Sequence, residues 1–205
     1  MEAKDYPRKW YQETKHYYQP FDLSDRFEHI VLPILEKLER PTIDLIEFGS
    51  CFWDVAWLTA RWTIEGFKYS ENSVQHRDLS QYASRLSRRL RSLGRLSSKT
   101  KTILYRMPHL TAQELDGYLP ATVIHQISST AEAVVRGLSG QTTGKPAFAA
   151  DQWDWESDVQ DAKALGMNKR LRLDHSGSML TGQHHFLGDN VHPNLLPNGK
   201  LWSDM

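Results

Sequence analysis

Several features are scarce or absent in this chain of 205 residues, and each absence excludes a class of protein. There is one cysteine, Cys51, so an internal disulfide is impossible. No run approaches the roughly 18 consecutive apolar residues of a membrane-spanning helix. Neither sign of charge is in excess, with 25 basic and 25 acidic residues, so the charge balance does not indicate a nucleic-acid partner. The N-terminus lacks the apolar stretch of a secretory signal peptide, and the compartment stays open.

What is present is the composition of an ordinary globular domain. Hydrophobic residues make up 40% and charged residues 24% of the chain, which is typical of proteins that bury a core. The length suits a single domain over residues 1–205. Residues 1–20 are aromatic and polar without a clear period. They predict a loop whose rings pack on the body, with a carbohydrate-facing surface as the alternative.

Helical patterns alternate with short apolar strands along the chain. The expected strands are residues 42–48 and 101–106, with a further strand end within 147–152. The expected helices are residues 24–38, a segment that begins with Asp54 as its cap, and residues 78–93, 121–138 and 159–165. This alternation is typical of an α/β fold with a parallel sheet and right-handed crossovers. Gly94 is expected to end the helix over residues 78–93. Gly137 and Gly140 are expected to help end the helix over residues 121–138.

The helix expected over residues 78–93 is strongly amphipathic. Its apolar stripe should face the core, and a flank of five arginines follows the stripe. The simplest interpretation of this flank is a solvated outer face. Binding of phosphate or of a polyanion is the alternative. The five are Arg85, Arg88, Arg89, Arg91 and Arg95.

Near the C-terminal end, Asp189 and His192 lie three residues apart between Gly188 and Pro193. The glycine permits a tight turn, and the proline disfavours a helical conformation at His192. The pair is therefore expected on a loop. There the carboxylate would fix the tautomer of an imidazole that acts as a general base. A polar turn without a catalytic role is the alternative.

Four segments carry a resemblance to a known family. They are Ser50-Cys51-Phe52-Trp53-Asp54 after a strand, residues 103–109 ending in Pro-His, residues 173–183, and Asp189-Asn190-Val191-His192-Pro193. In this order and separation they resemble the PC-esterase branch of the SGNH (GDSL-like) hydrolases, from about Tyr11 onward. The resemblance implies a three-layer α/β sandwich with a short, mainly parallel sheet, similar to flavodoxin. It also implies an O-acyl esterase or acyltransferase acting on an acylated small molecule or glycan.

The resemblance also implies roles for individual residues. His192 would be the general base and Asp189 the residue that orients it and stabilises the imidazolium. Trp53 occupies the place of an asparagine that donates to the oxyanion in the wider superfamily. Its indole N–H would either take over that donation or only pack. Asp54 would cap the following helix and brace the loop.

One part of the family pattern is missing. The family's nucleophile lies in a Gly-Asp-Ser turn after its first strand, and no such tripeptide occurs here. The sequence therefore predicts a domain that is incomplete at both ends, or one that has lost its catalytic serine and is kept as a binding module. Ser50 is the internal substitute to consider. Cys51 is expected to be a small buried residue, with a Cys51–His192 nucleophile pair as the less supported alternative.

A metal-dependent hydrolase is the remaining alternative. The chain offers imidazoles and carboxylates near its C-terminal end, but their spacing fits no standard zinc pattern. We therefore expect neither a metal nor an organic cofactor, no nucleic-acid partner and no membrane span, and the oligomeric state stays open. The residues in question are His175, His184, His185, His192, Asp174 and Asp189.

Overall fold

The computed structural model describes part of the chain, and the structural statements below concern that part. The described residues are 32–37, 43–49, 54–55, 58, 74, 76–96, 100–108, 121–149 and 153–176. They form an α/β fold. The elements in chain order are α3 (Leu32–Lys37), β1 (Leu45–Phe48), α5 (His76–Leu96), β2 (Thr102–Arg106), α6 (Ala121–Leu138), α7 (Trp155–Ala164), α8 (Met167–Arg170) and β3 (Leu171–Asp174).

The three strands form one parallel sheet in the order β1-β2-β3. Phe48 of β1 is opposite Tyr105 of β2, which is opposite Leu173 of β3. Parallel neighbours need a long crossover connection. Here α5 connects β1 to β2, and α6, α7 and α8 connect β2 to β3. The predicted parallel α/β fold is therefore confirmed.

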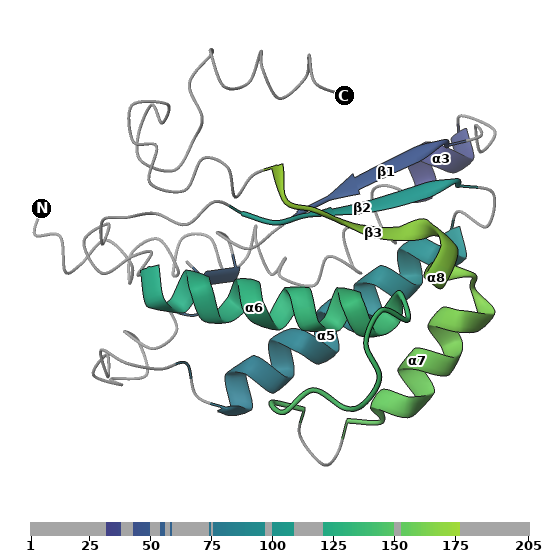
Figure 1. The fold of residues 1–205 in the computed structure, drawn as a ribbon. Helices are drawn as coiled ribbons and strands as arrows, with labels where there is room; N and C mark the ends of the chain where they lie inside the picture. Colours follow the sequence, from purple (N-terminus) through teal and green to yellow (C-terminus); the bar gives the residue numbers. More distant parts are fainter. Residues whose placement is uncertain are drawn as a thin grey trace, which may run out of the picture.

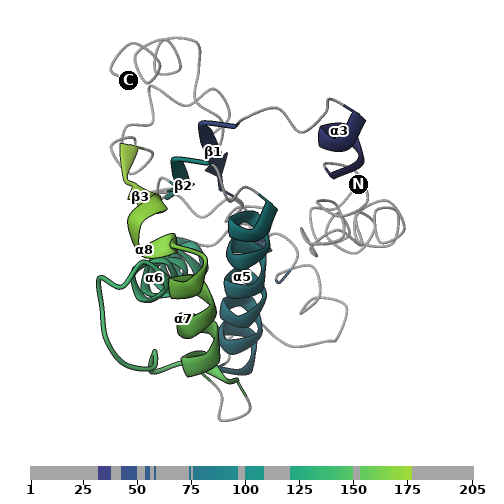
Figure 2. The same ribbon diagram turned by 90° about the vertical axis from the view of Figure 1, so that its right-hand side faces the viewer.

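Helices α5, α6 and α7 lie on the same side of the sheet (Figures 1 and 2). Strand side chains that point to this side are buried, including Ile103, Tyr105 and Leu171. The apolar stripe of α5 meets them, and Leu86 and Leu90 are completely buried. The core of the described part therefore lies between the sheet and one layer of helices. Alternate strand residues and the apolar stripe of α5 both face this space.

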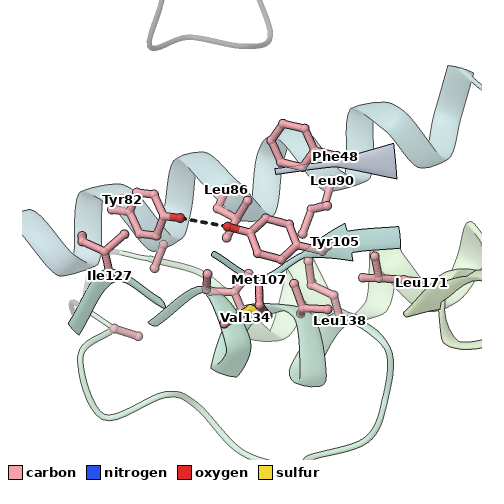
Figure 3. Packing of buried hydrophobic residues seen from close by; sticks show 14 of the residues in the cluster. Phe48, Tyr82, Leu86, Leu90, Tyr105, Met107, Ile127, Val134, Leu138 and Leu171 are labelled. Atoms are coloured by element: carbon pink, nitrogen blue, oxygen red, sulfur yellow. Dashed lines mark hydrogen bonds between the residues drawn. The ribbon is translucent and has the colours of Figure 1, made fainter. Parts of the chain in front are cut away.

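Two tyrosines meet at the centre of this core. The hydroxyl oxygens of Tyr82 on α5 and Tyr105 on β2 are 3.2 Å apart and share a hydrogen bond (Figure 3). The ring of Phe48 meets the Tyr105 ring edge-on, with centroids 5.6 Å apart. A buried phenol that lacks a partner is costly, so this pairing explains how the core accommodates two phenols.

Helix α5 confirms the predicted apolar stripe but not the predicted end. Gly94 lies inside the helix, which continues to Leu96. A side chain at Gly94 would come within 3.2 Å of the Met167 sulfur on α8, and the carbonyl oxygen of Gly94 accepts from Arg170. The glycine therefore permits close packing between α5 and α8 and does not end the helix.

Helix α6 has the predicted bounds, and its two glycines have different roles. Gly137 lies in the helix, where a methyl group would overlap the indole ring of Trp155. Gly140 follows the helix with a φ of 72°, and its N–H donates to the carbonyl oxygen of Gly137 at 3.0 Å. Gly140 thus ends α6, as predicted, whereas Gly137 makes room for a buried ring.

Part of the basic flank of α5 contacts α7 through Arg91 and Arg95, and Arg89 is buried, so the prediction of a solvated outer face is wrong for these residues. Asp158 of α7 accepts from the Ser87 hydroxyl at 2.6 Å and from the Trp153 indole N–H at 2.9 Å. It also forms an ion pair with Arg91, whose Nη1 donates to Asp161 at 2.8 Å. One carboxylate therefore connects α5, α7 and Trp153 in the segment before α7.

Two further predictions differ from the structure in the described residues, and one strand was missed. Helix α7 begins at Trp155, earlier than expected, because the Asp154 side chain accepts from the Ser157 N–H and caps it. Residues 147–149 form a turn and not a strand end. Strand β3 was not predicted.

Among the described helices, none combines the length and the apolar content that crossing a membrane requires.

Candidate functional site

The carboxyl ends of all three strands lie at one edge of the sheet, because the strands are parallel and in register. Gly49 follows β1, Met107 follows β2, and His175 follows β3. In open α/β sheets this edge is where ligands bind. It is therefore the first place to look for a site.

Arg106 connects the three strands at this edge. Its Nη1 lies 2.9 Å from Oε1 of Glu47 on β1, and its Nε donates to Oδ2 of Asp174 on β3 at 3.2 Å. All three side chains are partly buried. Alternation along the strands places them on the face opposite the Tyr105 ring. One guanidinium thus holds the ends of β1 and β3 on either side of β2.

Asp174 also fixes the chain as it leaves β3. Its Oδ1 accepts from the Ser176 backbone N–H and its Oδ2 from the Ser176 hydroxyl, both at 2.9 Å. Its carbonyl oxygen accepts from the N–H of Met107 at 2.8 Å, which continues the sheet ladder beyond β2. The segment after β3 therefore starts from a defined position at the edge.

The same contacts change the acidity of Asp174. Partial burial alone would raise its pKa, but the hydrogen bonds from Ser176, the hydrogen bond from Arg106 and the attraction to that guanidinium outweigh it. The pKa is therefore lowered from its ordinary value of 3.8.

This lowered pKa predicts a loss of stability in acid. The folded state binds the proton less readily than the unfolded state, so the stabilisation is complete above the ordinary pKa. It is lost as the pH falls through the lower folded-state pKa. We expect the difference in unfolding free energy between wild type and Asp174→Asn to shrink below about pH 4 in urea titrations. An Asp44→Asn control, at an exposed aspartate, should show no comparable change. A difference that stays constant from pH 7 to pH 3 would contradict the prediction.

Gly49 lets β1 end against β2. A side chain at this position would come within 3.0 Å of the Arg106 carbonyl oxygen. That distance is tighter than most real side-chain contacts, so a larger residue at this position would need a small shift of the β2 backbone.

Asp54 is the one predicted site residue that lies in the described part. It is in helical conformation and 7% exposed. Its Oδ1 lies 3.6 Å from Nη1 of Arg89 on α5, and Arg89 is 3% exposed. The two side chains line a small cavity with Tyr82, Asp78 and Arg85. Asp54 therefore forms a buried ion pair with α5, and its predicted roles as a helix cap and as a brace of the loop stay predictions.

The other predicted site residues lie outside the described residues. These are Ser50, Cys51, Trp53, Asp189 and His192. Asp174 and His175 are the described members of the possible metal-ligand set, and within the described ranges no three histidine, cysteine or acidic side chains are close enough to hold an ion. The position of His184 and His185 is likewise outside the described part.

The sequence did not identify Arg106 and Glu47 as residues of the sheet edge, nor Arg89 as the partner of Asp54. A signal for Arg106 exists, because a charged residue that ends an apolar strand has to find partners at the sheet edge. Its partners, Glu47 and Asp174, are far away in the chain. They come close to Arg106 only because of the order of the strands in the sheet. Arg89 was predicted to lie on a solvated flank. The helical period places it next to the apolar stripe, three residues after Leu86 and about 100° from Arg88 around the axis, so its burial had a signal in the sequence.

No family model, curated protein or solved structure matches the chain. The geometry of the sheet edge and the chemistry of the residues are therefore what a functional proposal has to rest on.

Proposed function

We propose that this chain is an O-acyl esterase or acyltransferase domain of the SGNH type, with the three-layer sandwich of that fold. One observation carries the proposal. The motif segment Ser50–Asp54 follows β1, and the segment that leads to Asp189 and His192 follows β3, while β1 and β3 end at the same sheet edge. Both segments therefore begin at the same edge of the sheet, which supports the proposed site.

In the proposed chemistry, His192 carries one proton through two successive transfers. Its imidazole removes the proton of an attacking hydroxyl as that oxygen bonds to the ester carbonyl, and then returns the proton to the leaving alcohol. Asp189 stabilises the imidazolium between the two steps. Trp53 either donates its indole N–H to the oxyanion or packs beside it. The substrate is an acylated small molecule or glycan.

The attacking hydroxyl is the open part of this proposal. The sequence holds no Gly-Asp-Ser, and Ser50 is the internal candidate because it follows β1 and Gly49. Within the proposal, Ser50 attacks the ester if the chain itself is active. A serine encoded upstream in frame takes that role if activity needs the upstream segment.

The test is hydrolysis of acetyl esters by this chain and by a version extended to include any in-frame upstream coding sequence. His192→Ala should lower kcat about 10²–10⁴-fold, and Asp189→Asn should also lower it. His125→Ala is the matched control, since His125 is exposed on α6 and should leave the rate unchanged. Ser50→Ala then decides whether Ser50 is the nucleophile.

Activity that His192→Ala leaves intact would overturn the proposal. So would the absence of hydrolysis and of acyl transfer in both versions, provided that each folds cooperatively. The latter outcome would favour a second function, a binding module of the same fold. That alternative is supported by the missing Gly-Asp-Ser and by the fully paired Glu47–Arg106–Asp174 cluster at the sheet edge.

A further inference from the structure

A polar groove of about 600 Å³ lies between α5 and the start of α7. The two helices are neighbours on the helical side of the sheet (Figure 2). The groove is on the flank of α5 that faces α7 and not on the flank that packs against the strands. It is therefore separate from the sheet edge that the proposed esterase chemistry uses. Its size is in the range of pockets that hold small organic ligands.

Cationic side chains of α5 line this groove. Arg85, Arg88 and Arg91 follow each other at intervals of three residues, so each is a neighbour of the next on the helix surface. Arg91 is committed to Asp158 and Asp161 of α7. Arg88 is exposed, and no carboxylate in the described part of the chain pairs with it. An anion in the groove would therefore meet Arg88 first, with Arg85 one turn before it.

The acidic residues of the groove are already occupied. Asp158 accepts from Ser87, from Trp153 and from Arg91. Asp154 caps α7 by accepting from the Ser157 N–H, where its charge also complements the helix dipole. The negative charge of Asp158 is thus compensated by Arg91, and the helix dipole offsets part of the charge of Asp154, so the charge of Arg88 is left to attract a ligand.

Neutral donors complete the lining. Ser84 on α5 and Ser157 on α7 contribute hydroxyls from the two walls of the groove. A tetrahedral oxyanion matches this set, because it takes bidentate bonds from a guanidinium and single bonds from hydroxyls. The groove is larger than a free phosphate ion needs, so it has room for the molecule that carries the oxyanion.

We propose that the groove between α5 and α7 binds a small organic anion through its phosphate or sulfate ester group, with Arg88 as the principal contact. A hexose 6-phosphate and a hexose 6-sulfate are suitable probes, and the unsubstituted hexose is the neutral control. Isothermal titration calorimetry of the 205-residue chain at constant ionic strength should show saturable binding of at least one ester and none of the hexose. Which ester binds identifies the source of the oxyanion.

Variants of two arginines on α5 test the assignment. Arg88→Ala should weaken binding about tenfold or more, because a charge-assisted contact is lost. Arg88→Lys should retain part of the affinity, since the charge remains without the bidentate geometry. Arg77→Ala is the matched control, because Arg77 is exposed on the same helix outside the groove. It should bind like wild type.

The proposal is overturned if neither ester binds to wild type, or if the hexose alone binds equally well. It is also overturned if Arg88→Ala binds like wild type. Arg88 is exposed, so its replacement should leave the urea midpoint unchanged, and a loss of binding then reports the contact itself. His192→Ala should not change the affinity, which separates the groove from the proposed esterase site.

Discussion

Replacing Asp158 by alanine is expected to lower the free energy of unfolding by about 3–5 kcal/mol, the cost of breaking a buried ion pair by removing one partner. Asp158 is 8% exposed. Its removal leaves the Ser87 hydroxyl and the Trp153 N–H without their acceptor and takes one of two carboxylates from Arg91. Each buried donor that loses its partner costs about 1–3 kcal/mol.

Equilibrium unfolding in urea measures this effect, and two variants serve as controls. Asp161→Ala removes a half-exposed carboxylate that also binds Arg91, while Asp158 remains in place. We expect it to cost about 1 kcal/mol or less, as surface ion pairs do. Asp158→Asn keeps one acceptor oxygen and should lie between the two. A loss for Asp158→Ala no greater than that for Asp161→Ala would show that the carboxylate does not organise the contact between α5 and α7.

Replacing Asp54 by alanine is expected to have an effect of similar size, about 3 kcal/mol or more. The guanidinium of Arg89 is 3% exposed and would lose a counter-charge 3.6 Å away. Because the pair joins the segment after β1 to α5, the loss also loosens the start of the proposed site. Thermal or urea unfolding measures the change.

A double variant separates the ion pair from simple packing. Asp54→Ala/Arg89→Met removes both charges and keeps most of the arginine's volume, so it should be at least as stable as Asp54→Ala. Asp44→Ala is the matched control, because Asp44 pairs with Lys101 on the surface with both side chains well exposed. It should stay close to wild type. Strictly additive losses in the double variant would mean that the two charges do not stabilise one another.

The sequence predicted what is periodic and local. Helix α6 has the bounds that its apolar residues indicate, because ten of its residues are buried and Gly140 can adopt the positive φ that ends it. Strands β1 and β2 were found by their short apolar runs. Strand β3 was missed, because Leu171–Asp174 offers two apolar residues and follows a short helix without a turn signal. Four residues are too few for a period to be recognised.

The contacts that matter at the candidate site are the ones that the sequence could not predict. Arg89 and Arg88 are adjacent on α5 and equally basic, yet one is buried against Asp54 and the other faces a groove. Their different exposure follows from the roughly 100° between adjacent positions on a helix, but the partner of Arg89 is Asp54, in a segment that precedes α5 by tens of residues. Arg106 likewise pairs with Glu47 and Asp174 because strand order brings β1 and β3 to its two sides. Partners of this kind follow from topology and not from local pattern.

Helix α5 is covered by the sheet on one side and by α7 on another, and this limits which of its residues can be substituted. An amphipathic helix on a surface usually accepts changes on a broad outer half. Beyond the first residue of α5, the exposed positions among His76–Arg95 lie along a narrow line through Arg77, Gln81, Arg88 and Arg95. Polar residues such as Ser87 and Arg89 are as enclosed as Leu86 and Leu90. Most positions around the axis of α5 are therefore constrained by packing. A polar residue in this helix is not necessarily one that can be replaced without loss of stability.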